Sequence, residues 1–356
     1  MTVTSPNPAP VADAPRSSGT RLVDRVFKMR ELAILVVFLV MIAVTQAGNS
    51  QFLSEQGVKD LLLNATILVL VATGQSLVVI TRNVDLSVGS TLGISAFAAG
   101  SYLQGGGNTV VAILLAVLLG IGSGLLNGLL VSLGQVPALV VTLGTLYIIR
   151  GIDSIWVGSR QITAADLPGG FVDFGSTGVS AVPWLAVIAL AVLVATAYFL
   201  KHYDSGRELY ALGSNPEAAR LAGIPVRKRL LAAYTFCGAL AGLAGVLYLA
   251  RFGNVDSGTG NGYELTVVSA VVVGGIAFTG GAGSVYGAAL GALLLTSINS
   301  VLPALGVSSV WVLAINGVLL LLAIAVDRVV ALRVAAALKK KSALRRTAMA
   351  KETSGA

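Results

Sequence analysis

Ten long apolar stretches, separated by short polar or glycine-rich breaks, constrain this chain more than any other feature of its sequence. A helix that crosses the hydrocarbon core of a bilayer needs ~20 mostly apolar residues, and most of the stretches approach that length. They are Leu32–Ala47, Leu61–Ile80, Val84–Leu103, Thr109–Leu133, Val136–Ile149, Val182–Leu200, Leu230–Ala250, Tyr263–Thr279, Ser284–Leu302 and Val310–Val326. The sequence therefore predicts an all-α, polytopic membrane protein with about ten transmembrane helices.

Charged residues are too few for a soluble protein of this size. Asp, Glu, Lys and Arg make up 11% of the 356 residues, whereas the apolar residues and tyrosine make up 55%; charged residues are about a quarter of an ordinary globular domain. The single cysteine, Cys237, and the single histidine, His202, exclude a disulfide framework and a Cys/His metal cluster, since such clusters usually take four ligands. Zinc and redox chemistry are therefore not expected.

Basic residues gather in three regions, and their placement predicts the orientation in the membrane. Of the 24 Lys and Arg residues, 19 lie within residues 16–30, 201–229 or 328–351. An even number of expected spans separates each region from the next, so all three lie on one side of the bilayer. That side is expected to be the cytoplasm, where loops are enriched in Lys and Arg. The net charge of +8 thus reflects topology, and binding to nucleic acid is not expected.

These patterns divide the chain into three expected parts. Residues 1–30 form a disordered leader, rich in Pro, Ala and Ser, and a basic flank. The first apolar stretch acts as an uncleaved signal anchor. Residues 31–327 form the transmembrane domain, with a long cytoplasmic loop at 201–229, and residues 328–356 form a basic cytoplasmic tail.

A polar break at Arg82–Ser90 lies between the second and third apolar stretches. Ionisable side chains at membrane depth cost roughly 2.5–3.5 kcal/mol on insertion scales, which favours a specific role. In one interpretation the third helix begins near Asp85, whose carboxylate accepts hydrogen bonds from its first turn. In the other, Asn83, Asp85 and Ser87 face a pathway and offer polar groups to a hydroxyl-rich substrate. The sequence leaves both open.

Two further polar residues are candidates for such a pathway. Gln75 lies within the second stretch, and Glu264 lies near one end of the eighth; each could instead bond to a neighbouring helix. A weak internal repeat, G-S-x-x-G at Gly89–Gly93 and Gly283–Gly287, follows an apolar run and a short break in both cases. Corresponding breaks in two halves indicate a pathway between two weakly related halves.

The loop between the sixth and seventh stretches contains a short helix signal. Asn215 can cap a helix with Pro216 at its first position and Glu217 in its first turn, and Gly223 can end it. We expect a helix of about two turns on the membrane surface, with Ala218, Ala219 and Ala222 forming a face of small residues. A simple surface-lying linker would give the same pattern.

Three motifs, in their order along the chain, resemble those of the permeases of ATP-binding-cassette importers, in the ribose/xylose/rhamnose branch. Glu217-Ala218-Ala219 with Gly223 and Ile224 is similar to their E-A-A-x-x-x-G coupling loop. Val84–Gly89 is similar to the I-D-L-S-V-G signature of the branch, and Gly262–Leu265 with the glycines up to Gly287 is similar to its second-half signature. Asn83 stands where the branch usually has glycine, a variant that resembles the rhamnose and autoinducer-2 permeases. The resemblance covers nearly the whole chain.

The resemblance implies a subunit of a bacterial sugar importer that is not itself an enzyme. Its partners would be a cytoplasmic ATPase that binds ATP and Mg, an extracytoplasmic sugar-binding protein, and a second permease copy or paralogue; the chain itself would hold no cofactor. The loop around Asn215, Glu217 and Ile224 would sit in a groove of the ATPase. The external segment Asp153–Ala181 would be a loop that contacts the binding protein or is simply solvated.

Two other classes of function agree less well with the sequence. An ion-coupled secondary transporter usually carries a chain of acidic residues or histidines inside its spans, whereas here only Asp85 and Glu264 qualify. An intramembrane enzyme needs a nucleophile with a base or a metal cluster. The chain also lacks a G-x-x-x-x-G-K-[ST] loop, so any energy from a nucleotide must come from a partner.

Overall fold

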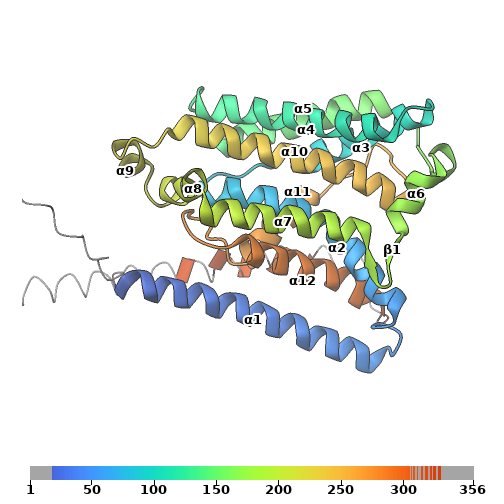
Figure 1. Cartoon of the computed structure of the whole chain (residues 1–356), viewed down its shortest axis with the longest axis horizontal. Coiled ribbons are helices and arrows are strands. Elements are labelled where there is room, and N and C mark those ends of the chain that lie inside the picture. The colour runs from blue at the N-terminus through green and yellow to red at the C-terminus, as the bar shows by residue number, and fades with distance from the viewer. Residues whose placement is uncertain are drawn as a thin grey trace, which may run out of the picture.

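The computed structural model describes residues 18–304 and scattered residues between 306 and 329, and within them the chain is almost entirely helical (Figure 1). The elements are α1 (Ser18–Gly48), α2 (Glu55–Ile80), α3 (Val88–Gln104), α4 (Thr109–Ser132), α5 (Ala138–Val157), the 3-10 helix η1 (Ala164–Asp166), α6 (Gly169–Ser176), β1 (Gly178–Val179), β2 (Val182–Pro183), α7 (Trp184–His202), α8 (Asp204–Ser214), α9 (Pro216–Leu221), α10 (Val226–Phe252), α11 (Tyr263–Val273) and α12 (Val285–Ala304).

Six helices in the described part of the chain are long and apolar enough to cross a membrane: α2, α4, α5, α7, α10 and residues 285–302 of α12. The apolar part of α1, Leu32–Gly48, and α11 are shorter. The all-α, polytopic fold expected from the sequence is thereby confirmed. The tenth expected span, Val310–Val326, is described only in part, and residues 1–17 of the leader and nearly all of the tail lie outside the described residues.

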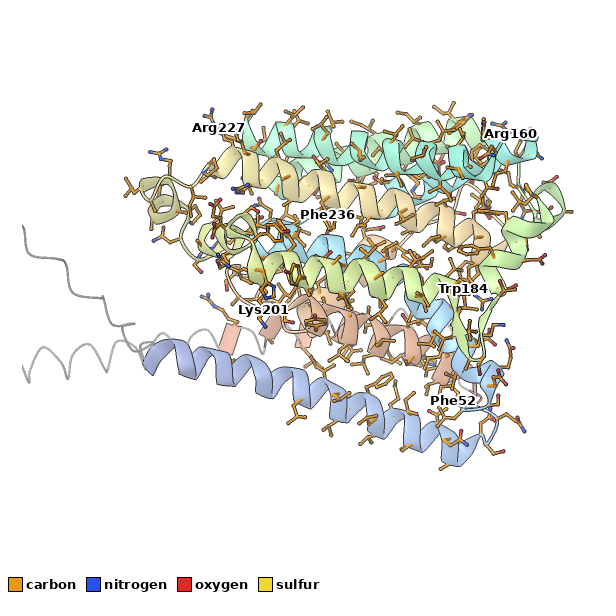
Figure 2. The ribbon with its side chains drawn as sticks, viewed as in Figure 1. Phe52, Arg160, Trp184, Lys201, Arg227 and Phe236 are labelled. Atoms are coloured by element: carbon orange, nitrogen blue, oxygen red, sulfur yellow. The ribbon has the colours of Figure 1, made fainter. Side chains whose placement is uncertain are left out.

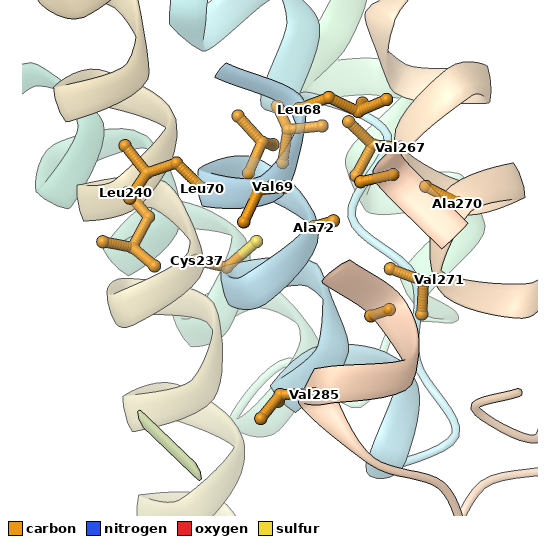
Figure 3. Packing of buried hydrophobic residues seen from close by; sticks show 14 of the residues in the cluster. Leu68, Val69, Leu70, Ala72, Cys237, Leu240, Val267, Ala270, Val271 and Val285 are labelled. Atoms are coloured by element: carbon orange, nitrogen blue, oxygen red, sulfur yellow. The ribbon is translucent and has the colours of Figure 1, made fainter. Parts of the chain in front are cut away.

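Helix α2 forms the centre of the bundle. In its most apolar window, 94% of the residues are buried, against 22% in α4 and in α5. Figure 3 shows Val69 and Ala72 of α2 between Cys237 of α10 on one side and Val267 and Val271 of α11 on the other. A helix that is apolar all round must be buried or face lipid. The two cases are realised by α2 in the core and by α4 and α5 at the surface.

Glycines allow α4 and α10 to cross with their backbones in contact. A Cβ atom at Gly120 would lie 2.1 Å from the carbonyl oxygen of Gly238, and one at Gly124 would lie 2.2 Å from that of Tyr234. Close approach of this kind is what glycines four residues apart permit in membrane helices. Gly120, Gly124 and Gly238 therefore form the contact between α4 and α10.

Two of the helices begin at breaks within the bundle. After α2 the chain turns at Arg82, in a left-handed conformation with φ 65°, and runs without helical structure to Ser87. Helix α3 begins at Val88, so the prediction of a helix start near Asp85 was wrong by three residues. After α10, residues 253–262 lead without helix to Tyr263, where α11 begins.

The segment Asp153–Ala181 is not a plain loop. Helix α5 continues to Val157, so Asp153 is buried within a helix, and η1, α6 and the antiparallel pair β1–β2 follow it. Phe171 is buried in a second hydrophobic cluster. Outside the membrane-spanning helices, hydrogen bonds from the Thr163 N–H and hydroxyl lower the pKa of Asp166. Figure 1 shows α6 and β1 at one end of the bundle and α8 and α9 at the other.

Candidate functional site

Helix α9 is the short capped helix expected in the loop after α7. The Asn215 side chain accepts a hydrogen bond from the Ala218 N–H at 3.1 Å, and Pro216 occupies the first helical position. Gly223 follows the helix with φ 81°. The predicted helix is therefore confirmed, although only Ala219 is buried, whereas Ala218 and Ala222 are exposed.

The exposed surface of α9 is both charged and apolar. Glu217, Ala218 and Leu221 are exposed, and the Leu221 side chain is 85% exposed. Ile224, by contrast, is partly buried, and its N–H donates to the carbonyl oxygen of Ala219 at 3.1 Å. A rigid helix thus presents one large apolar side chain away from the rest of the described chain.

Helix α8 connects α9 to the ends of two transmembrane elements. A guanidinium N–H of Arg82, just after α2, donates to the carbonyl oxygen of Ser214 at 2.9 Å. The Gly281 N–H donates to the carbonyl oxygen of Ile80 at 2.8 Å. A Cβ atom at Gly213 would lie 1.8 Å from that oxygen and 2.5 Å from the Gly281 nitrogen. The end of α8, the end of α2 and the loop before α12 therefore form one tight junction, which we call the α8 junction.

The Asp85 carboxylate lies in a buried hydrogen-bond network. Its Oδ1 accepts from the Ser87 N–H at 2.9 Å, from the Ser87 hydroxyl at 2.7 Å and from the Asn127 amide of α4 at 3.2 Å. Asn127 also donates to the Ser87 hydroxyl oxygen at 2.8 Å. Asp85 is 1% exposed. Its carboxylate thus bonds to the residue before α3 and to α4, and not to the first turn of α3.

Side chains from several helices hold the backbone of this break. The Thr142 and Tyr234 hydroxyls lie 3.3 and 3.4 Å from the carbonyl oxygen of Val84. The Gln75 amide, with its oxygen toward the Asp85 N–H and its nitrogen toward the Asp85 carbonyl, makes contacts of 3.1 and 3.3 Å. Unpaired backbone groups are costly in a membrane, and these contacts satisfy them. Gln75, Asp85 and Ser87 are thus brought together.

Asn83 and Glu264 lie apart from that network. The Asn83 amide donates to the carbonyl oxygen of Thr81 at 2.9 Å. Glu264 is in the first turn of α11, and its Oε2 is buried without a hydrogen-bond partner in the part of the chain that the structure describes. A Cβ atom at Gly89, in the first turn of α3, would lie 2.3 Å from this oxygen. The first turns of the two broken helices therefore meet at Glu264, where the free N–H groups of both helices favour negative charge.

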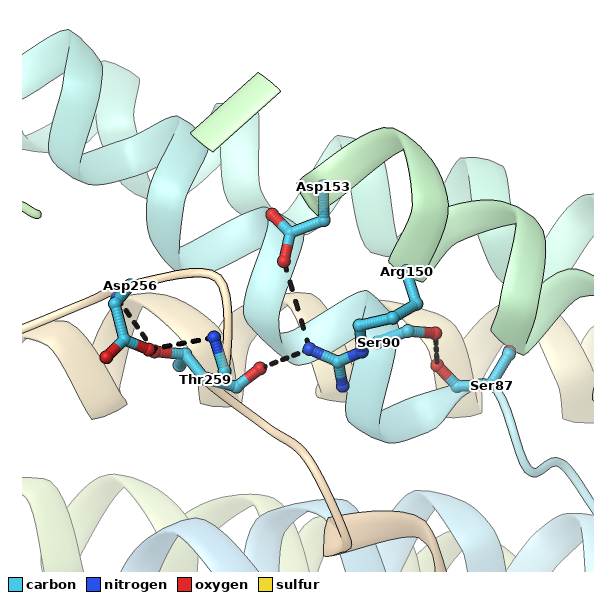
Figure 4. A network of polar contacts seen from close by, with 7 residues as sticks. Ser87, Ser90, Arg150, Asp153, Asp256 and Thr259 are labelled. Atoms are coloured by element: carbon cyan, nitrogen blue, oxygen red, sulfur yellow. Dashed lines mark hydrogen bonds and ion pairs between the residues drawn. The ribbon is translucent and has the colours of Figure 1, made fainter. Parts of the chain in front are cut away.

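The sequence analysis missed a second polar cluster beside α3 (Figure 4). A guanidinium nitrogen of Arg150 donates to the carbonyl oxygen of Thr259 at 2.7 Å and lies 3.8 Å from the Asp153 carboxylate. Asp153 is fully buried. Arg150 lies just after the expected span Val136–Ile149, and Asp153 begins the expected external segment. Asn127, a lone amide in an apolar stretch, could have been singled out from the sequence. In the described residues, no three His, Cys, Asp or Glu side chains gather as metal ligands would.

Comparison with known proteins identifies the family. Residues 57–324 match the family model described as the branched-chain amino acid transport system / permease component. Over 295 residues, 82% of this chain and 84% of the relative, the chain is 38% identical to the autoinducer 2 import system permease protein LsrC of Salmonella typhimurium. It is 37% identical to LsrC of Escherichia coli O157:H7 over 84% of this chain and 86% of that protein. It is 35% identical to the ribose import permease protein RbsC of Escherichia coli K12 over 87% of this chain and 97% of that protein. No solved structure matches the chain.

A family model that covers most of the chain and relatives that are similar over nearly their full length give the same classification. This chain belongs to the family of transport-system permease components.

Proposed function

We propose that this chain is the transmembrane permease subunit of an ATP-binding-cassette importer for a monosaccharide or a sugar-like small molecule. The similarity to permeases named for autoinducer 2 import and ribose import carries the proposal. A cytoplasmic ATPase that binds ATP and Mg drives transport, an extracytoplasmic binding protein delivers the cargo, and a second permease copy or paralogue completes the pathway. The chain lies in the bacterial inner membrane with both termini in the cytoplasm.

Helix α9 is the element on which the ATPase acts. Its exposed Glu217, Ala218 and Leu221 form a contact surface, and Asn215 and Gly223 fix its two ends. The α8 junction then carries a displacement of α9 to the end of α2 and to the loop before α12, because the backbones touch there. A rigid helix in contact with backbone transmits motion that a flexible loop would absorb.

The first test compares two substitutions of Gly223. A β-branched side chain is strained at φ 81°, whereas asparagine tolerates the left-handed region. Holding an unsuitable residue in the left-handed conformation raises the free energy of the folded state by ~1–2 kcal/mol. We therefore expect Gly223→Val to lower uptake about tenfold and Gly223→Asn to retain most of the uptake. A Cβ atom there meets nothing within 4 Å, so neither variant introduces a clash.

The measurement is uptake of labelled ribose and autoinducer 2 by cells that express the chain with its cognate ATPase and binding protein. Labelled leucine is included because the family description names branched-chain amino acids. Saturable uptake of ribose or autoinducer 2 that requires the ATPase supports the proposal. Uptake driven by an ion gradient without the ATPase, or uptake of leucine alone, would contradict it. Equal uptake by the Val and Asn variants would exclude α9 as the coupling element.

The cargo passes where α3 and α11 begin, beside Glu264. An unpartnered carboxylate oxygen between two helix starts is available to accept hydrogen bonds from cargo hydroxyls. Asn83, Asp85, Ser87 and Gln75 lie at the break between α2 and α3. Of these, Asp85, Ser87 and Gln75 act mainly through the shape of the break, since their polar groups already have protein partners.

The two carboxylates are therefore expected to respond differently to substitution. Asp85→Ala removes the acceptor of three hydrogen bonds, so it should destabilise the folded chain by about 1–3 kcal/mol, whereas Asp85→Asn keeps an acceptor oxygen and should preserve both stability and uptake. Glu264→Gln should lower the unfolding temperature only slightly, since the two helix starts lose a favourable charge, but it should lower uptake about tenfold, because the carboxylate Oε2 has no hydrogen-bond partner among the described residues and is free to accept one from the cargo. Thermal unfolding of the purified chain and uptake in cells separate the two effects. Unchanged uptake in Glu264→Gln would remove this carboxylate from the pathway.

A further inference from the structure

A charged pair lies inside the bundle on α5, one of the helices long enough to cross a membrane. Arg150 is partly buried and Asp153 is fully buried, and the guanidinium lies 3.8 Å from the carboxylate. In the described residues, both Asp153 carboxylate oxygens and the Arg150 Nε have no hydrogen-bond partner. Ionisable side chains in a membrane-spanning helix are costly, so such a pair indicates a specific role. The proposed transport mechanism does not use it.

Stability alone does not explain the pair. Replacing a buried ion pair by apolar residues of similar volume is often neutral or stabilising, because the cost of removing two charges from water can exceed their attraction. The attraction is weaker still here, since the carboxylate oxygens accept no hydrogen bond within the described part of the chain. Asp153 therefore provides only a counter-charge, and the functional half of the pair is the Arg150 guanidinium.

The Arg150 guanidinium binds the loop that leads from α10 to α11. Its Nη1 donates to the carbonyl oxygen of Thr259 at 2.7 Å, and Figure 4 shows it between that carbonyl and Asp153. Among the described residues, this is the only hydrogen bond that joins residues 256–262 to an element other than α11. The other bonds of the segment form its own turns, such as the bond from the Thr259 N–H to Asp256. Arg150 thus anchors a segment that is otherwise self-contained.

The anchored segment lies directly on the first turns of α3. A Cβ atom at Gly93 would lie 2.4 Å from the carbonyl oxygen of Thr259. One at Gly260 would lie 2.2 Å from the carbonyl oxygen of Gly89. Backbone therefore touches backbone along one turn of α3, and the oxygen that Arg150 binds is at one of these contacts.

Glu264 follows this contact by four residues and is the second residue of α11. A Cβ atom at Gly89 would lie 2.6 Å from the Gly260 carbonyl oxygen and 2.3 Å from the Glu264 Oε2. The contact of the segment with α3 and the place of the carboxylate are therefore set together. Releasing Thr259 would allow the start of α11 to move away from α3, and the carboxylate would move with it.

We propose that Arg150 is a positioning residue of the cargo site. Its bond to Thr259 holds residues 256–262 against α3 and so fixes the Glu264 carboxylate between the two helix starts. Asp153 supplies the charge that allows the guanidinium to stay buried. This role rests on the proposed function of Glu264 in cargo binding, and Arg150 accordingly affects transport only through that carboxylate.

The test removes the guanidinium without leaving a lone buried charge. The double variant, Arg150→Met with Asp153→Asn, loses no hydrogen bond at residue 153, because the carboxylate oxygens accept none in the described part of the chain. It should therefore accumulate in the membrane as the unmodified chain does. Uptake should nevertheless fall about tenfold, as expected for the loss of one hydrogen bond from a charged group. Arg150→Lys alone keeps the charge and a donor, so it should retain most of the uptake.

Hydrogen–deuterium exchange of the assembled transporter shows whether the segment is released. The amides of residues 259–266 should exchange about tenfold faster in the double variant, whereas those of α9 should not change. Arg160→Met is the matched control. Figure 2 shows Arg160 at the end of the bundle that carries α6, and its guanidinium donates to the carbonyl oxygens of Trp156 and Val157 at the end of α5. This control should change neither exchange nor uptake.

A third measurement tests whether Arg150 acts through Glu264. In the Glu264→Gln background, the double variant should lower uptake by less than about twofold, because the effects of residues that act as a unit do not add. A full further loss there, unchanged exchange in residues 259–266, or failure of the double variant to accumulate would overturn the role of Arg150. Normal uptake in Glu264→Gln alone, with faster exchange in the double variant, would instead overturn the role of Glu264 in cargo binding and leave Arg150 as the residue that places α11.

Discussion

Gly213→Leu is expected to abolish uptake while the chain remains inserted in the membrane. Any side chain at residue 213 would overlap the carbonyl oxygen of Ile80 and the Gly281 nitrogen, which lie 1.8 and 2.5 Å from the Cβ position. Both obstacles are backbone atoms, so the clash can be relieved only by separating α8 from the end of α2. Such overpacking typically costs 1–3 kcal/mol and sometimes more. Substrate should then no longer stimulate ATP hydrolysis by the assembled transporter.

Ala211→Leu is the matched control for this prediction. Ala211 is on the same helix, two residues before Gly213, and is exposed, so it adds similar bulk without a clash and should support normal uptake. Arg82→Gly provides an independent test, because it removes the bond to Ser214 at a left-handed position that suits glycine. We expect it to lower uptake about threefold. Normal substrate-stimulated ATPase activity in Gly213→Leu would show that the junction does not transmit the motion of α9.

The sequence predicts those parts of the fold that local signals determine. Asn215, Pro216 and Gly223 bound α9 as expected, because each acts on the backbone within one turn. The long apolar spans were also found, since bilayer thickness sets their length. The expected span ends at Ile149, eight residues before the end of α5, because the apolar run stops at Arg150 and Asp153 follows it. Their charges are accommodated by each other and by Thr259, which lies more than a hundred residues away in the sequence.

In the candidate site, too, the sequence predicts local features but not the contacts between distant residues. The residues of the break at 83–87 were identified, but the role of each depends on partners from other helices. Asn127 and Gln75 are the hydrogen-bond partners of the Asp85 side chain and backbone. No local sequence pattern specifies these partners. The meeting of Glu264 with Gly89 is likewise a tertiary contact. Sequence patterns thus predict which residues are unusual, whereas packing determines whether their polar groups are already satisfied.

At the crossing of α4 and α10, Gly124→Leu is expected to prevent the chain from accumulating in a folded form. Gly122→Leu is expected to have no such effect. The two glycines lie on the same helix. A Cβ atom at Gly124 would lie 2.2 Å from the carbonyl oxygen of Tyr234, but one at Gly122 meets nothing within 4 Å. Leucine favours helix over glycine by ~1 kcal/mol at either position, so helix propensity cannot explain a difference between the variants.

The clash at Gly124 should cost about 3 kcal/mol or more, because α10 cannot move away without also withdrawing Tyr234 from Val84. The break between α2 and α3 would then lose one of the hydroxyl groups that hold it. The measurement is the amount of monodisperse chain in detergent extracts, followed by fluorescence-detected size-exclusion chromatography of a tagged chain. Equal amounts of the two variants would mean that α4 and α10 do not pack through Gly124, and the close crossing of these two helices would have to be abandoned.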